Sequence, residues 1–349
     1  MIINLSSPHI HGGDSVRMTM ISVILALTPA AIVSVYLFGW LAFLLITLCM
    51  VTCVATEYIS LRLMGRPATP VGDGSAALTG LLLALTLPAY IPWWMVVLGS
   101  VIAIVLGKQL YGGLGYNLFN PALAARVILL ISFPLNMTAW IVPMQVAAPV
   151  IDLYNFSDCF NLFLYGPESI ARTLDAITMA SPLGHIKTEW SQGIGVTEAL
   201  RNYDYSYLNA FLGREAGSIG ETSALALLIG GIYLLARHTI SWHIPFTYLA
   251  TVMVLAAIFN MVDPAHYAPP LFHLLAGGLI LCAFFMATDP VSSPVTARGR
   301  VVFGIGCGIL TWSIRTYGGY PEGAMFAVIL MNCAVPLIDH YCRPRVYGH

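Results

Sequence analysis

Residues 108–113 read Lys108-Gln-Leu-Tyr-Gly-Gly113, and residues 315–319 read Arg315-Thr-Tyr-Gly-Gly319. These two strings are similar, and a second, weaker similarity relates Thr86-Leu-Pro88 to Thr288-Asp-Pro290. The members of each pair lie five apolar segments apart, and an odd number of crossings would place the second copy upside down in a membrane. The pattern therefore predicts two inverted five-helix repeats. Chance similarity between short glycine-containing strings is the alternative.

Composition places the chain in a membrane. Its 349 residues are 58% hydrophobic and 9% charged, which is far from the balance of a soluble globular protein. A bilayer-spanning helix needs about 20 mostly apolar residues. The third, fifth and ninth apolar segments fall short of that length, so we expect broken or half-length helices there. The ten segments cover residues 18–37, 40–61, 75–89, 92–107, 121–134, 221–236, 244–260, 271–287, 301–314 and 324–340.

Basic residues predict the orientation. The short connections around Gly39, Tyr90 and Asp263 carry no Lys or Arg. The other side and the two ends hold Arg17, Arg62, Arg66, Lys108, Arg126, Arg237, Arg298, Arg300, Arg343 and Arg345. By the positive-inside rule both termini are cytoplasmic. We therefore expect a first repeat at 1–135, an irregular extracytoplasmic domain at 136–220, and a second repeat at 221–349.

Charge and cysteine content exclude several classes of site. A net charge of −1 argues against nucleic acid binding, which needs clustered basic residues. The seven cysteines form no Cys-x-x-Cys or Cys/His cluster, which argues against a zinc or iron–sulfur site. No dinucleotide-binding fingerprint occurs either. We expect no metal site and no catalytic group on this chain.

Two stretches carry candidate binding residues. Asn117-Leu-Phe-Asn120-Pro121-Ala opens the fifth segment, where Asn120 is a natural helix cap and Asn117 lies just before it. Helix N-termini inside a membrane attract polar or anionic groups, although a simple capping role fits equally. In Asp175-Ala-Ile-Thr178-Met-Ala180-Ser181-Pro182 small and hydroxyl residues crowd before a proline, so a large group could be attached to a hydroxyl there. A Ser181 that only begins the turn before Pro182 is the alternative.

Six strings spread over the chain resemble one known family. They are 81–99 LLLALTLPAYIPWWMVVLG, 108–117 KQLYGGLGYN, 117–134 NLFNPALAARVILLISFP, 287–300 ATDPVSSPVTARGR, 314–328 IRTYGGYPEGAMFAV and 335–349 VPLIDHYCRPRVYGH. They resemble the D subunits of the Rnf ion-translocating electron-transport complex. Those subunits are similar to the B subunit of the sodium-pumping NADH:quinone reductase. The resemblance is weakest in 136–174 and 189–220.

The resemblance implies an all-α polytopic membrane protein with ten transmembrane helices in a urea-transporter-like fold. It also implies FMN bound covalently, as a phosphoester, to the outer loop. The family pattern, roughly Asp-x-x-Ser/Thr-x-Ala-Thr, falls on Asp175, Thr178, Ala180 and Ser181. Here Ser181 replaces the Thr that a separate flavin transferase modifies in the family. Serine offers the same oxygen, and nearby Thr178 leaves the attachment residue open.

Further expectations follow from the resemblance. Lys187 would pair with the FMN phosphate or the reduced flavin, and Asn117, Asn120 and Thr79 would line a site for a second, non-covalent riboflavin. The chain would be one subunit of a six-subunit complex in a bacterial inner membrane, beside a second covalent-flavin subunit. The complex would be a ferredoxin:NAD⁺ oxidoreductase coupled to Na⁺ or H⁺ movement. This chain would pass electrons through its FMN, between the neighbouring flavin subunit on the outside and carriers nearer the cytoplasm, and would not be catalytic alone. A passive channel for a small polar solute and a structural scaffold are the alternatives.

Overall fold

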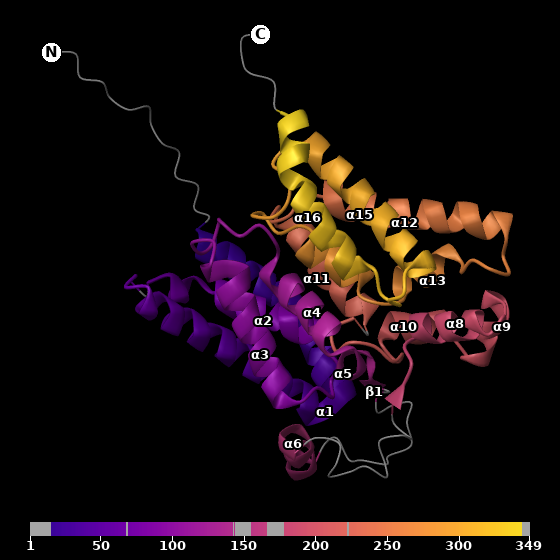
Figure 1. Ribbon diagram of the computed structural model, residues 1–349, viewed down its shortest axis with the longest axis horizontal. Coiled ribbons are helices and arrows are strands. Elements are labelled where there is room, and N and C mark those ends of the chain that lie inside the picture. The colour runs from indigo at the N-terminus through magenta and orange to yellow at the C-terminus, as the bar shows by residue number, and fades with distance from the viewer. Residues whose placement is uncertain are drawn as a thin grey trace, which may run out of the picture.

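The computed structural model describes residues 15–67, 69–141, 143, 155–165, 178–221 and 223–343. In these ranges the chain is mostly helical (Figure 1). The first half contains α1 (Val16–Leu63), η1 (Thr69–Asp73), α2 (Ser75–Thr86), α3 (Trp93–Ile104), η2 (Val105–Gln109), α4 (Pro121–Ser132) and α5 (Pro134–Thr138). The middle contains β1 (Trp140–Ile141), α6 (Phe156–Tyr165), β2 (Thr178–Met179), α8 (Pro182–Ser191), α9 (Val196–Asn202) and α10 (Tyr207–Leu212). The second half contains α11 (Ala224–Ala236), α12 (His243–Val262), α13 (Pro270–Leu275), α14 (Leu279–Leu281), η4 (Cys282–Met286), α15 (Ala297–Tyr317) and α16 (Ala324–Tyr341).

The helices fit the expectation of a membrane protein. In the described ranges, α1, α12 and α16 are long and apolar enough to cross a bilayer. Shorter apolar helices cover Ser75–Thr86, Trp93–Gln109, Pro121–Ser132 and Ala224–Ala236. Each of the ten apolar segments recognised in the sequence contains helix. Among the described residues, the exception to an all-helical fold is the two-residue antiparallel pair of β1 and β2.

The continuous helix α1 is a hairpin of two helices. Gly39 interrupts it with φ 61° and ψ −144°, outside helical values. Met20 and Glu57 would lie about 55 Å apart in one straight helix, at 1.5 Å per residue. Instead both approach the start of α2: Met20 lies beside Gly74, and Glu57 and Ser75 both contact Lys108. The chain therefore turns back at Gly39, as its place between two apolar segments predicted.

The interrupted helices are only partly those we expected. The third and fifth segments form short helices of 12 residues each, α2 and α4, as predicted. The prediction for the ninth segment was wrong, because α15 runs unbroken for 21 residues. Arg315 lies inside this helix. Its buried guanidinium donates to the carbonyl of His273 in α13 and to that of Ala276, the C-cap of α13. The eighth segment is broken instead, between α13 and α14, where Gly277 adopts φ 70°.

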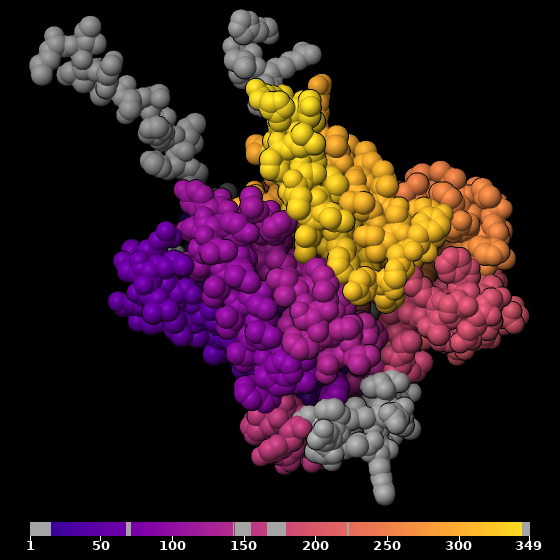
Figure 2. Space-filling view, viewed as in Figure 1, coloured from indigo at the N-terminus to yellow at the C-terminus, as the bar shows by residue number. Residues whose placement is uncertain are grey.

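Small residues bring helices close together in the second half. An added Cβ at Gly304 would stand 2.0 Å from Oγ1 of Thr247, and one at Gly308 would stand 2.6 Å from Cβ of Thr251. This small-x-x-x-small spacing lets α15 approach the α12 backbone, which is the usual way helices associate in a membrane. Figure 2 shows the surfaces of the two halves, indigo to magenta and orange to yellow, adjoining along a seam.

Residues before α11 cross this seam and tie the middle of the chain to the first half. The Ile219 N–H donates to the Leu87 carbonyl at 3.1 Å, and the Gly220 N–H to the Leu85 carbonyl at 2.8 Å. The Ser34 hydroxyl of α1 donates to the Ile219 carbonyl at 2.8 Å. Helices α8, α9 and α10 therefore lie at the edge of the helical body, away from the C-terminal end of α16 (Figure 1).

Candidate functional site

Ser181 lies where a strand turns into a helix. It follows β2, which pairs antiparallel with β1 through Thr178 opposite Ile141, and it is the N-cap of α8. The Ser181 Oγ accepts a hydrogen bond from the Gly184 N–H at 3.2 Å, while its carbonyl accepts from His185 at 2.8 Å. Pro182 occupies the first helical position, where no N–H is needed. The hydroxyl is half-buried, so it is both fixed in place and reachable.

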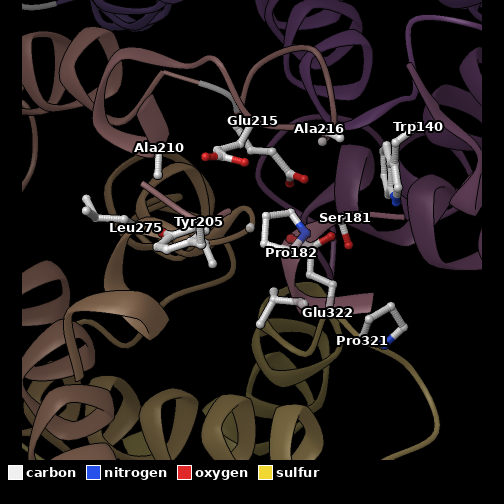
Figure 3. Close-up of a pocket in the computed structure, with 15 residues that line it drawn as sticks. Trp140, Ser181, Pro182, Tyr205, Ala210, Glu215, Ala216, Leu275, Pro321 and Glu322 are labelled. Atoms are coloured by element: carbon white, nitrogen blue, oxygen red, sulfur yellow. The ribbon is translucent and has the colours of Figure 1, made fainter. Parts of the chain in front are cut away.

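A pocket of about 30 Å³ opens beside Ser181 (Figure 3). Ser181 and Pro182 lie at the centre of its lining, with Trp140 at one end and Tyr205 and Leu275 at the other. Its lining comes from residues within 136–220, the break between α13 and α14, and the connection before α16. The volume suffices for water but not for an enclosed cofactor. This pocket therefore lies between residues of 136–220 and residues of the second half of the chain.

Two carboxylates, Glu221 and Glu322, line the same pocket. Glu322 Oε1 accepts from the Gly278 N–H at the start of α14, at 2.6 Å. Glu221 Oε1 accepts from the Ser218 N–H at 2.9 Å. Arg315 lies nearby and donates to the carbonyls of His273 and Ala276, at 2.5 and 2.8 Å. The break in the eighth segment is thus stabilised by a glutamate on one side and by an arginine on the other.

Lys187 is held by a helix end. Its ammonium donates to the carbonyls of Gly318, at 2.5 Å, Ile314, at 3.3 Å, and Tyr320. These carbonyls lie at the C-terminus of α15, where helices favour a cation. Burial, and then repulsion by Arg315, lower the pKa of Lys187 to about 8. Lys187 therefore fastens α8 to α15, and its pairing with a flavin phosphate stays a prediction.

The structure describes only some of the other residues of the attachment pattern. Asp175 lies outside the described residues, and the backbone of Thr178 belongs to β2. Ala180 is exposed between β2 and α8. The choice between Ser181 and Thr178 therefore stays a prediction. Glu215, which the sequence did not single out, lines the Ser181 pocket, and burial raises its pKa to about 7.

A second, larger pocket of about 140 Å³ contains the predicted membrane site. Asn117, Asn120 and Thr79 all line it, together with Phe284 and Phe285 of η4. Asn120 caps α4 by accepting from the N–H groups of residues 122 and 123, at 3.1 and 3.4 Å, so it has the capping role. Asn117 is 6% exposed, and its Oδ1 has no partner among the described residues. This unpaired acceptor is available to a ligand.

Beside the larger pocket lies an ion pair that the sequence did not predict. The Lys108 ammonium contacts Glu57 Oε1 and donates to the Ser75 hydroxyl at 2.5 Å. Gln109 donates to the same Glu57 oxygen at 3.0 Å. Lys108, which we expected in a cytoplasmic connection, is 2% exposed. Arg126 was expected there too, but it lies within α4 and is 1% exposed.

Comparison with known proteins gives consistent results. The model of the NQR2, RnfD, RnfE family matches residues 3–348. A protein of Stutzerimonas stutzeri, named as the D subunit of an ion-translocating oxidoreductase complex, is 48% identical over 96% of this chain and 93% of its own. The protein of that name from Halorhodospira halophila is 44% identical, over 99% and 95% of the two chains. The one from Cronobacter sakazakii is 43% identical, over 99% and 98%.

Proposed function

The chain belongs to the NQR2, RnfD, RnfE family, and from that premise we propose that it is the membrane subunit of an ion-translocating oxidoreductase complex. It carries electrons through an FMN attached by a phosphoester to Ser181. The relatives named as the D subunit of such a complex support the assignment. The observation that carries the flavin proposal is the half-buried Ser181 hydroxyl at the N-terminus of α8.

The surroundings of Ser181 fit a phosphoester. A phosphate on its Oγ would lie at the N-terminus of a ten-residue helix, where free N–H groups and the helix dipole favour an anion. The Gly184 N–H already points at Oγ. An added Cβ at Gly184 would stand 3.3 Å from Oγ, so the glycine leaves space beside the hydroxyl. FMN, when bound, supplies the redox chemistry, and this chain supplies its position and charge environment.

The small pocket constrains where the flavin ring can be. At about 30 Å³ it is at least tenfold smaller than the sites that enclose drug-sized ligands. The ring of an FMN on Ser181 would therefore not be enclosed by this chain. A ring outside the chain is suited to exchange electrons with a neighbouring subunit, and a tether keeps its local concentration high.

The larger pocket has a lining suited to a second, non-covalent flavin, riboflavin. Its volume of about 140 Å³ is also below that of sites that enclose drug-sized ligands, so riboflavin would be only partly enclosed there. Asn117 and Asn120 offer amides at one wall, and the rings of Phe284 and Phe285 offer an aromatic wall. Flavin rings need hydrogen bonds at their polar edge and apolar contact on their faces, and the lining provides both. The unpartnered Oδ1 of Asn117 is the acceptor we assign to such a ligand.

The proposal also includes the arrangement of the helices in the membrane and the partner subunits. The ten segments form two inverted five-helix repeats, 1–135 and 221–349, in a bacterial inner membrane with both ends cytoplasmic and 136–220 periplasmic. The burial of Lys108 and Arg315, one in each Tyr-Gly-Gly string, supports equivalent roles in the two repeats. The other subunits of the six-subunit complex provide ferredoxin and NAD⁺ chemistry, and Na⁺ or H⁺ is moved. A flavin transferase matures Ser181.

In-gel flavin fluorescence of the denatured chain, co-expressed with a flavin transferase, tests the proposal. Wild type is expected to fluoresce and Ser181→Ala to be dark, because no oxygen remains for the bond. Thr178→Ala is the matched control and is expected to fluoresce. A dark Thr178→Ala with a fluorescent Ser181→Ala would move the bond to Thr178. A dark wild type, beside a relative that the same transferase modifies, would refute the covalent flavin.

A further inference from the structure

Glu221 and Glu322 face each other across the break between α13 and α14. An added Cβ at Gly278 would stand 2.8 Å from Glu322 Oε1 and 3.0 Å from Glu221 Oε2. Both carboxylates thus approach one point from different parts of the chain, Glu221 from the residues before α11 and Glu322 from the connection before α16. Glu221 is 7% exposed, so bulk water does not separate the two groups.

Within the described part of the chain, neither carboxylate is matched by a cation at contact distance. No ion pair in those ranges joins either of them to Arg126 or Arg315. Arg315 uses both terminal nitrogens on carbonyls of α13. Oε2 of Glu221 and Nε and Nη1 of Arg126 have no hydrogen-bond partner among the described residues. Buried polar atoms without partners are rare and point to something that completes them.

Charges surround the pair from several elements. Arg126 on α4 and Arg315 on α15 act on both carboxylates through space. Cys282 on η4 interacts electrostatically with both of them, and Glu215 lines the same pocket. With both glutamates ionised, the two arginines balance them at long range. Two carboxylates that approach one point still repel, and buried pairs of this kind relieve the repulsion by binding one proton.

We propose that Glu221 and Glu322 share one proton and form the extracytoplasmic proton-binding site of this chain, at the base of the pocket that contains Ser181. Water in the pocket delivers the proton to a carboxylate oxygen, which becomes an O–H that the other carboxylate accepts. Release reverses the step, and no covalent bond or electron is involved. The purpose of the site rests on the proposed function. An electron arriving at a carrier on Ser181 adds negative charge nearby and favours proton uptake by the pair.

Labelling by dicyclohexylcarbodiimide tests this, because the reagent attacks protonated carboxyls in apolar surroundings. The full-length chain carrying Ser181→Ala is used in detergent, so the result does not depend on flavin attachment. Peptide mass spectrometry locates the label. At pH 7, where an ordinary Glu with a pKa of about 4.3 is ionised, we expect one label on the pair, on Glu221 or Glu322. Glu215, with a pKa of about 7, is expected to take a separate label that the peptide masses distinguish.

The decisive variant is Glu322→Gln. In this variant burial still favours a proton on Glu221, but the repulsion by Glu322 is gone and two arginines remain, so labelling of Glu221 at pH 7 should fall about tenfold, equivalent to a pKa change of about one unit. Glu215→Gln, in the same pocket but outside the pair, should leave labelling of the pair unchanged. Circular dichroism shows whether Glu322→Gln is folded, and Glu221→Gln repeats the test from the other side.

Three outcomes would overturn the proposal. The first is no label on either glutamate in the folded chain at pH 7. The second is unchanged labelling of Glu221 in Glu322→Gln, which would make burial alone the cause of its protonation. The third is protection by Na⁺ at constant pH and ionic strength, which would assign the pair to a metal cation. None of them bears on whether Ser181 carries flavin.

Discussion

Among the described residues, a buried charged cluster lies beside each of the two pockets described above, and the two clusters differ in their partners. In the inner cluster, beside the larger pocket, the Lys108 ammonium touches Glu57 and Ser75. In the outer cluster, beside Ser181, Glu221 and Glu322 approach one point but contact no cation among the described residues. Oε2 of Glu57 also lacks a partner in the described ranges, yet its carboxylate is neutralised at contact distance.

This difference separates a structural role from a binding role. A buried ion pair at contact distance needs both of its members, because removing one leaves an uncompensated charge in a low-dielectric interior. A carboxylate pair with distant arginines can change its proton content at small cost. A shared proton relieves the repulsion between the two carboxylates, and the arginines offset their charge at long range when both are ionised. We therefore expect the inner cluster to be sensitive to loss of one partner and the outer cluster to tolerate it.

The largest expected effect is on the inner cluster. Glu57→Gln keeps the shape of the side chain but leaves the Lys108 ammonium without its carboxylate, which should lower the free energy of unfolding by about 3–5 kcal/mol. Glu322→Gln, at the outer cluster, should cost less than about 1.5 kcal/mol. Denaturant unfolding in detergent, followed by circular dichroism, measures both.

The double variant Glu57→Gln/Lys108→Met is the control, because it removes both charges. It should regain much of the stability lost in Glu57→Gln. Equal decreases in the free energy of unfolding for Glu57→Gln and Glu322→Gln would contradict the proposed difference between the two clusters.

A smaller effect is expected at the larger pocket. Asn117→Ala removes the unpartnered Oδ1 that we assign to riboflavin, and loss of one hydrogen bond to a buried ligand costs about 1.5 kcal/mol, or about tenfold in affinity. The quantity to measure is riboflavin bound to the purified chain in equilibrium dialysis. Leu118→Ala, next along the chain but exposed, serves as control. Equal binding by wild type and Asn117→Ala would remove Asn117 from the site.

The sequence predicted the positions of the helices better than the burial of their charged side chains. Gly39 marked the α1 hairpin because glycine alone between two apolar runs favours a turn, and Asn120 with Pro121 marked the start of α4. Lys108 and Arg126 were assigned to connections because the positive-inside rule counts charges without knowing their partners. Lys108 is buried because Glu57, distant in sequence, lies beside it in the fold.

The candidate site was predictable only where its residues are close in sequence. Ser181 and Pro182 form a local strand-to-helix turn, so their pattern could be read directly. Glu221, before α11, and Glu322, before α16, are distant in sequence and both approach the break at Gly278, which no local pattern shows. The unbroken α15 has the same cause, since carbonyls of α13 hold Arg315 inside the helix.

The smallest expected effect concerns Lys187, which joins α8 to α15. Its pKa of about 8 is below that of an unfolded lysine, about 10.4, so between these values the unfolded chain holds more protons. Stability of the wild type should therefore rise with pH across that window, and Lys187→Met should lack the rise. Because the side chain is only half-buried, the gain should be about 0.5 kcal/mol or less.

Unfolding measured from pH 7 to pH 10 tests this, with Arg201→Met as control. Arg201 is exposed at the end of α9 and stays charged throughout, so its loss should shift the stability curve without changing its slope. A wild type parallel to Lys187→Met at every pH would mean that the ammonium on the α15 carbonyls is not strained by burial. Lys187 would then only cap the C-terminus of α15. The difference between an inner cluster with a fixed ion pair and an outer cluster that can change its proton content would depend on Glu221 and Glu322 alone.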